Sequence, residues 1–374
     1  MKMNRSGCLI VTVITLLAFE LLTAHAALRQ QPPYPQSSVI KRVEFDFATH
    51  RRLAPGSDNW PVTWADDGHL YTAWGDGGGF GGTNSEGRVK LGVARIDGNV
   101  EGYSGINIWG GFKPQKPPQF DGKSYGIISV DGVLYMWVAA QPARHMESSA
   151  IAQSTDHGMH WKLADWKYTF EDELSVPTFL NFGQDNSGAR DEYVYSYLIE
   201  PTWGPGTLPQ TEHGFDVHKP GRIHLTRVPK ELVFQRDRHQ FFAGFATDGS
   251  ATWSSNIEAK QPVFEDSNGV GWNVSVSYNA GLRRYILCTE HSQSHAGQLG
   301  MFDASEPWGP WTTVAYENSW GEGQIETSAF FWNFTQKWIS ADGAKFTMIF
   351  SGKNSNDSWN TIDGRFILPA PDLQ

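Results

Sequence analysis

The chain has 374 residues, a formal net charge of −10 and an aromatic content of 13%, with 16 tryptophans. An acidic chain without a basic cluster is a poor partner for nucleic acid, so we expect no nucleic-acid binding. The only cysteines are Cys8 and Cys288. Loss of an N-terminal segment that contains Cys8 would leave a chain that can form no internal disulfide.

The first 26 residues are predicted to be a secretory signal peptide. Lys2 and Arg5 form a basic start, an apolar run covers 9–22, and Ala24-His25-Ala26 is a small-x-small cleavage site. We therefore expect a secreted or periplasmic protein. Beyond this segment no apolar run is long enough to span a membrane, so we expect no membrane-spanning part.

Residues 27–40 contain a Gln- and Pro-rich stretch and are predicted to be a linker or a lead-in strand. The remaining residues, 41–374, show strand patterns and almost no helical periodicity. One short turn of helix is expected at 229–232.

The strands recur as one unit: an inner strand, a tight turn, an apolar strand, a longer loop and a third strand. The unit starts near residues 61, 125, 177, 273 and 328. Repeats of several strands at this spacing are typical of a β-propeller. We therefore predict a single all-β domain over 41–374, a β-propeller with five blades. A count of six or seven stays open if 231–268 contains further strands.

Two short motifs agree with a propeller. The stretch Ser154-Thr155-Asp156-His157-Gly158-Met159-His160-Trp161 fits the S-x-D-x-G-x-x-W "Asp-box" turn of sialidase-like propellers. In that turn the Ser and Asp side chains bond the backbone and the Trp packs between strands. The stretch Pro307-Trp308-Gly309-Pro310-Trp311-Thr312 resembles a turn near the blade edge of five-bladed glycosidases.

The first repeat brings two carboxylates together. A hairpin turn centred on residue 67 would place Asp58 opposite Asp76, with Cβ atoms about 4.5–5.5 Å apart. Trp60 and Trp74 lie beside them and are candidate stacking walls for a sugar. Opposed like charges destabilise a sheet, which suggests a cation, a sugar or acid/base chemistry at this place. The alternative is that both aspartates only cap turns.

Two close carboxylates suit double-displacement glycoside hydrolysis, in which they lie about 5–5.5 Å apart. A wider pair, such as Asp58 with Glu173, would suit inversion with a water between them. The inner strands of a propeller begin at the rim of its central channel, where ligands usually bind. Residues near the starts of inner strands and the ends of second strands are therefore further candidates for the site. The alternative catalytic candidates are Glu173, Glu326 and His291, and the candidates for substrate binding are Tyr125, Arg190, Asn273 and Tyr278.

We expect no cofactor and no catalytic metal. His291 and His295 have a spacing that would suit a metal on a helix, but the surrounding residues indicate a loop. A structural calcium or another cation in the central channel stays open.

Four stretches, 57–80, 178–183, 188–195 and 278–285, resemble a bacterial and fungal family long known only as a domain of unknown function. That family is related to endo-D-arabinanase-type glycoside hydrolases with a five-bladed propeller. The resemblance implies catalysis by Asp58, which opens the first blade, and by Asp76 in a Gly-Asp motif. The family has Gly-Asp-Thr where this chain has Gly75-Asp76-Gly77, so the sugar is not defined by the resemblance.

The sequence thus predicts a monomeric, carbohydrate-active glycoside hydrolase that degrades a polysaccharide or oligosaccharide with a carboxylate pair. Two alternatives stay open. A polysaccharide lyase would use His291, Tyr125 and Arg190 against a uronate. A non-catalytic sugar-binding propeller would use the same aromatic side chains without chemistry.

Overall fold

The computed structural model describes residues 30–140, 148–202 and 216–370. The chain divides into two compact units, Met1–Gln31 and Pro32–Gln374. The predicted signal peptide, 1–26, lies outside the described residues. Within the described part of the chain, no helix has the length and apolar character needed to cross a membrane.

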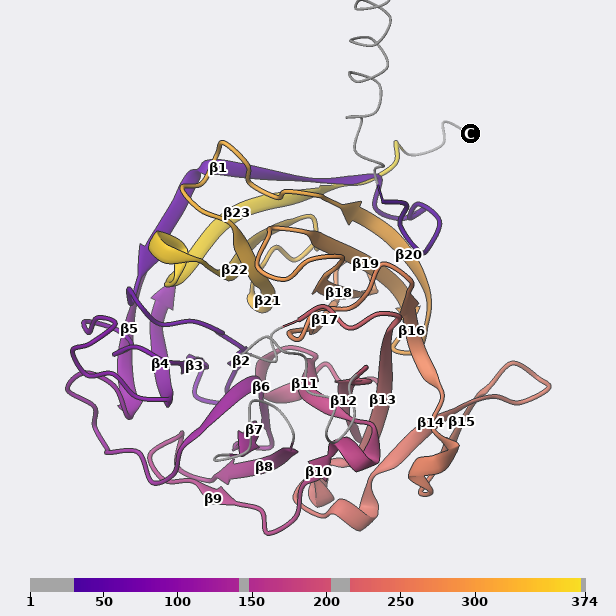
Figure 1. Ribbon diagram of the computed structural model, residues 1–374, viewed down its shortest axis with the longest axis horizontal. Coiled ribbons are helices and arrows are strands. Elements are labelled where there is room, and N and C mark those ends of the chain that lie inside the picture. The colour runs from indigo at the N-terminus through magenta and orange to yellow at the C-terminus, as the bar shows by residue number, and fades with distance from the viewer. Residues whose placement is uncertain (1–29, 141–147, 203–215, 371–374) are drawn as a thin grey trace, which may run out of the picture. The chain divides into compact units, whose positions relative to one another are not determined.

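Within Pro32–Gln374 the strands form four hydrogen-bonded sheets, and the largest sheet divides where β11 (Ser175–Asn181) pairs in parallel with β17 (Ser275–Asn279). We number the resulting antiparallel groups blades I to V in chain order (Figure 1). Blade I comprises β2 (Val62–Trp64), β3 (Leu70–Gly75), β4 (Leu91–Asn99) and β5 (Gly102–Trp109). Blade II comprises β6 (Gly122–Val130), β7 (Val133–Ala140), β8 (Ser148–Ser154), β9 (Lys162–Leu163) and β10 (Tyr168–Thr169).

The later blades follow the same plan. Blade III comprises β11 (Ser175–Asn181), β12 (Tyr193–Ile199), β13 (Gly221–Pro229), β14 (Gln240–Phe245), β15 (Ala251–Ser254) and β16 (Pro262–Asp266). Blade IV comprises β17 (Ser275–Asn279), β18 (Arg284–Glu290), β19 (Leu299–Glu306) and β20 (Gly309–Tyr316). Blade V comprises β21 (Ala329–Ile339), β22 (Lys345–Gly352), β23 (Trp359–Ile367) and β1 (Arg42–Leu53).

The helical elements of the described residues are short 3-10 turns: η1 (Phe170–Asp172), η2 (Gln184–Asn186), η3 (Lys230–Leu232), η4 (Arg236–Arg238), η5 (Ile257–Ala259) and η6 (Asn354–Asn356). The prediction of an all-β propeller is confirmed. The segment 231–268 does contain further strands, and they extend blade III because β14 and β16 both pair with β13.

The first strand of each blade, namely β2, β6, β11, β17 or β21, lies innermost (Figure 1). Groups near the ends of these strands bond one another. The Thr63 hydroxyl donates to the Asn181 side chain at 2.8 Å, and the Gln336 side chain donates to the backbone carbonyls of Asn181 and Tyr278. The inner strands therefore run in the same direction and begin on one face of the propeller. We call this the upper face. The second strand of each blade ends there, because it is antiparallel to the first.

The channel between the inner strands is filled by side chains. All five inner strands line a cavity of about 10 Å³, which has room for about one water molecule. The chemistry of the upper face is therefore separated from that of the lower face.

Blade V is built from both ends of the propeller unit. The outer strand β1 pairs with β23 from Arg42↔Ile367 to Leu53↔Trp359. The residues before β1 also belong to this unit: Gln36 forms a bridge with Thr313, and Ile40 is fully buried. Most of the predicted linker or lead-in strand, from Pro32 onward, thus packs on the propeller.

Most of the tryptophan surplus packs in the core. Seven tryptophans are less than 2% exposed: Trp60, Trp74, Trp109, Trp137, Trp272, Trp332 and Trp359. Trp60 and Trp74 of blade I pack with Trp359 and Ile349 of blade V. Burial of large flat side chains between twisted sheets removes much apolar surface from water, which holds neighbouring blades together.

Candidate active site

The first hairpin has the predicted turn but a different register at its open end. The pairs Val62↔Thr72 and Trp64↔Leu70 agree with a turn centred on residue 67. Farther out, Asp58 pairs with Gly75: its N–H donates to the Gly75 carbonyl at 3.0 Å and its carbonyl accepts from the Gly75 N–H at 2.8 Å. The direct opposition of Asp58 and Asp76 is therefore wrong by one residue.

The register shift has a local cause. Asn59 has a φ of +57°, and the next residues include Pro61, which has no N–H to donate. A left-handed residue that adds one position to a strand forms a β-bulge and turns the side chains that follow it.

Gly75 leaves room that two charged side chains fill. A Cβ on Gly75 would lie 3.1 Å from Asp58 Oδ1 and 3.2 Å from Lys123 Nζ. Lys123 comes from β6 of blade II and is 8% exposed, and its Nζ lies 2.7 Å from Asp76 Oδ1. Arg88 lies 3.2 Å from the same oxygen. A basic side chain from the next blade thus lies between the two aspartates of blade I.

The electrostatic environments of the acidic groups differ. Burial raises the pKa of Asp58 to about 8; Lys123 opposes this rise, while Asp357 and Asp76 add to it. Asp357, which follows η6 of blade V, has a pKa raised to about 6 by burial and by Asp76. Asp58 is partly exposed, so solvent can reach it. At neutral pH, Asp58 is therefore mostly a neutral acid beside an aspartate that two cations hold.

We call the group described so far the centre; it comprises Asp58, Asp76, Arg88, Lys123 and Asp357. Two further predicted residues lie beside it on the upper face. Tyr125 is 2% exposed, and its pKa lies well above the ordinary value because of burial, Asp58 and Asp76. Its ring meets that of Trp272 edge to face at 5.4 Å. The Tyr125 hydroxyl and both amide atoms of the buried Asn273 have no hydrogen-bond partner among the described residues. A water or a ligand could supply the missing bonds.

Trp60 and Trp74 do not form open walls. Both side chains are 0% exposed, and they stack on each other with ring centroids 5.6 Å apart. Neither ring presents a free face, so the expectation that they stack on a sugar does not fit this structure. Their role is packing beneath the aspartates.

Arg190 and Tyr278 lie on the lower face. Arg190 precedes β12, and Tyr278 lies near the end of β17. The Arg190 guanidinium pairs with Glu306 and lies 4.6 Å from the Trp308 ring centroid. Strand direction therefore separates both residues from Asp58. Arg190 therefore forms a salt bridge on the lower face and does not fit a lyase site that acts on a uronate together with His291 and Tyr125.

The three alternative catalytic candidates lie outside the centre. Glu173 is paired with Lys260 at 3.0 Å in blade III. Glu326 is exposed and accepts two bonds from Arg52 at 2.9 and 3.0 Å. His291 is 0% exposed, and burial lowers its pKa to about 4; its Nε2 lies 3.1 Å from the Glu317 carbonyl.

A buried carboxyl group also lies on the upper face of blade IV. Glu290 ends β18 and is 0% exposed, and burial raises its pKa to about 8, against a bond from the His295 N–H at 2.5 Å. His295 stacks on Trp272, which in turn contacts Tyr125. Glu290 thus holds the backbone of His295, and the His295 ring packs on Trp272 next to Tyr125.

Lys123 opens the inner strand of blade II, a position that the sequence marks as a candidate, whereas two other polar residues of the centre escaped the sequence prediction. Arg88 lies in the same β3–β4 loop of blade I as Asp76, and Asp357 reaches the site because blade V packs on blade I. Neither position carries a sequence signal.

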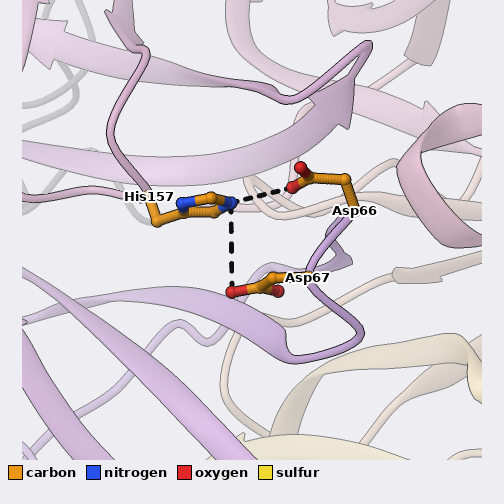
Figure 2. Close-up of side chains that lie close together, drawn as sticks. All are labelled: Asp66, Asp67 and His157. Atoms are coloured by element: carbon orange, nitrogen blue, oxygen red, sulfur yellow. Dashed lines mark hydrogen bonds and ion pairs between the residues drawn. The ribbon is translucent and has the colours of Figure 1, made fainter.

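One group of described side chains has the spacing to hold a metal ion: Asp66, Asp67 and His157, on the lower face (Figure 2). Their potential ligand atoms lie within 4.8 Å of one another. His157 Nε2 lies 2.8 Å from Asp66, and Tyr71 donates to Asp67 at 2.8 Å. The His157–Asp66 bond connects the hairpin of blade I to the Ser154–Trp161 turn of blade II, and the Tyr71–Asp67 bond lies within that hairpin. These two bonds account for the group without an ion.

No known protein-family profile matches the sequence, and no curated protein matches it. A solved structure from Bacteroides ovatus, described as a candidate hydrolase, is similar with a TM-score of 0.51 and 10% identity, over 86% of this chain and 89% of that one. A GH43_1 enzyme from Xanthomonas citri gives a TM-score of 0.49 and 14% identity, over 90% and 93%. Likeness at such identity describes the fold and not the reaction.

Proposed function

We propose that the protein is a glycoside hydrolase whose reaction takes place at Asp58 and Asp76. The observation that carries this proposal is the pair of unlike aspartates on the upper face. Asp58 is a partly buried acid with a pKa raised to about 8, and Asp76 is paired with Lys123 and Arg88. Two carboxyl groups in unlike environments provide the acid and the base that glycosidic cleavage needs.

In this mechanism Asp58 donates its proton to the glycosidic oxygen as the bond from that oxygen to the anomeric carbon breaks. Asp76 faces the anomeric carbon as nucleophile, or activates the water that attacks it. Water supplies the hydroxyl group of the new reducing end and restores the proton. Lys123 acts as a positioning residue for Asp76, and Tyr125 and Asn273 offer polar atoms to sugar hydroxyls.

The site favours hydrolysis over the two alternatives. A lyase based on His291 and Arg190 would need both on one face, whereas His291 is buried against a backbone carbonyl and Arg190 lies on the lower face. A binding-only propeller has no need of a half-buried neutral acid. We propose further that the protein is secreted or periplasmic, as its N-terminal pattern suggests, and that it acts as a monomer.

A screen of neutral and uronate polysaccharides from plants, algae and mycobacteria tests the proposal. Wild type, Asp58→Asn and Asp76→Asn are assayed for reducing ends and for absorbance near 235 nm. Asp248→Asn, in the exposed β14–β15 turn, is the matched control. We expect reducing ends without absorbance, and a loss of about a hundredfold or more in both site variants. Absorbance that survives both substitutions would establish a lyase instead.

A further inference from the structure

A polar pocket lies on the upper face of blade III, at some distance along the rim from Asp58. It has a volume of about 370 Å³, within the range of small-molecule sites. Its lining includes Glu173, Glu200, Arg222, His224, Lys260 and Glu265. Glu173 precedes the inner strand β11, and Glu200 follows the second strand β12, so the pocket shares its face with the proposed active site. We call it the blade III pocket.

The walls of the blade III pocket form a connected network of charges. Arg222 lies 2.9 Å from Glu200 and 3.4 Å from Glu265, and His224 Nε2 lies 2.8 Å from Glu200. The hydrogen bond from His224, followed by that from Arg222, lowers the pKa of Glu200 to about 2 against its burial. Glu200 is therefore ionised at neutral pH, and Arg222 and His224 both bond to it.

Two of these side chains are almost fully buried, which is unusual for their types. The Lys260 side chain is 7% exposed and pairs with Glu173 at 3.0 Å. The His224 side chain is 3% exposed, and its Nδ1 has no hydrogen-bond partner within the described ranges. Glu173 itself has a φ of +54°, a conformation that side-chain-bearing residues rarely adopt. A buried ammonium group, a buried imidazole and strained backbone are more typical of a binding site than of a solvated surface.

The composition of the pocket defines the class of ligand. The surface is nearly all polar, which disfavours a lipid or an aromatic ligand. With Glu258, the lining has four glutamates against two basic side chains, Arg222 and Lys260, and the His224 imidazole. This excess of carboxylates disfavours uronates and phosphates because they would be repelled. Carboxylate oxygens retain lone pairs after pairing, and arginine and lysine retain N–H donors. Alternating acceptors and donors suit the hydroxyl groups of a neutral sugar.

We propose that the blade III pocket is a remote glycan subsite, which binds a neutral sugar unit of the same chain that is cleaved at Asp58. This inference rests on the proposed function and deepens it. Blade II lies between the pocket and the aspartates, so a glycan that reaches both must be several sugar units long. The substrate class is therefore a long neutral polysaccharide or oligosaccharide.

The test compares long and short substrates. Arg222→Ala removes the donor that links Glu200 to Glu265, and Arg222→Lys keeps the charge. Arg365→Ala, which removes an exposed arginine paired with Glu44 on the lower face, is the matched control. We expect Arg222→Ala to raise KM on the neutral polysaccharide about tenfold while kcat changes little, and to raise KM on a short glycoside far less. Arg222→Lys should recover part of the loss.

A binding measurement separates this proposal from the proposed function. Calorimetry with neutral oligosaccharides of increasing length is done on Asp58→Asn, with and without Arg222→Ala, after thermal melting shows that both are folded. If the wild type cleaves no glycan but Arg222→Ala still weakens binding of long oligosaccharides, the proposed hydrolysis fails and the subsite stands. If Arg222→Ala affects long and short substrates equally, or neither, the subsite is overturned. Tighter binding of oligouronates than of neutral chains would overturn the ligand class.

Discussion

Asp58 is the residue that should govern the pH dependence of turnover. A general acid acts in its protonated form, and burial raises the pKa of Asp58 to about 8. We expect activity to fall as the pH rises above about 8. Asp357→Asn removes a negative neighbour that raises this pKa, so the alkaline limb of the kcat/KM profile should move to lower pH. Profiles of kcat/KM for wild type and Asp357→Asn between pH 4 and 10 would show this shift. An alkaline limb at the same pH in both proteins would show that Asp58 is not the general acid.

The same group couples stability to pH. Its folded-state pKa lies above the ordinary value of 3.8, so the folded protein holds this proton more tightly than the unfolded chain does. The contribution of Asp58 to stability is therefore fully present below about pH 4 and is lost as the pH rises toward 8. We expect Asp58→Asn to flatten this part of the curve of unfolding free energy against pH, measured by urea denaturation. A variant curve parallel to that of the wild type would contradict the assignment.

Asp76 and Lys123 form an ion pair, so a substitution at Asp76 should also change the free energy of unfolding. Lys123 is 8% exposed, and Asp76 is its only ion-pair partner among the described residues. Asp76→Asn leaves a nearly buried ammonium group unpaired and should cost about 1–3 kcal/mol.

A double-mutant cycle measures this coupling. Lys123→Met removes the charge while keeping the stem, so Asp76→Asn combined with Lys123→Met should recover most of the stability that Asp76→Asn loses. Denaturant melts of the four proteins give the coupling energy. Additive effects of the two substitutions on the free energy of unfolding would show that the contribution of Lys123 to stability does not depend on Asp76.

The candidate site was predictable only in part, because sequence pattern reports strands and not the direction of side chains. Asp58 and Asp76 were found from a hairpin, and Tyr125 and Asn273 from their place at strand starts. Trp60 and Trp74 looked like a sugar-binding surface, but the twist of blade I directs them into the contact with blade V. The approach of Lys123 depends on the packing of two blades, on which local pattern carries no information.

At the level of elements, the sequence predicted most of the strands well. Alternating apolar residues and Gly- or Asp-containing turns define the inner and second strands of every blade, as in 125–130 and 133–139. The hairpin β14–β15 was not predicted in detail, because its residues are only partly buried and its apolar pattern is weak. The outer strand β1 was missed as well, since its partner β23 lies at the far end of the sequence.

The turn from Ser154 to Trp161 shows how an element is stabilised away from the site. Ser154 donates to Asp156 at 2.9 Å, Asp156 accepts from the His160 N–H at 2.9 Å, and the Trp161 ring is 6% exposed. Asp156→Ala removes these bonds and should destabilise the protein by about 1–3 kcal/mol with unchanged kcat, because the turn lies on the lower face. Melting curves and steady-state assays would test this; a large fall in kcat would connect the turn to catalysis.

For the whole molecule, the common direction of the inner strands has the largest consequence. Every inner strand begins on the upper face, so loops that are remote in sequence, from Asp58 to Asp357, meet around one centre. The lower face instead carries tight turns and ion pairs such as Arg190–Glu306. The blades therefore act as rigid supports, and specificity depends on the loops of one face.

The closure of the propeller depends on its N-terminal strand. β1 covers β23, and without it a long strand edge with free N–H and C=O groups would be exposed. Deletion of 1–31 removes the other compact unit and leaves every described strand in place, so it should leave the melting temperature within a degree or two. Deletion of 1–53 removes β1 together with the buried Ile40, and we expect loss of cooperative melting and aggregation through β23. Scanning calorimetry and light scattering of the two truncations would test this. A folded, monomeric 54–374 fragment would show that blade V is stable without the strand that closes it.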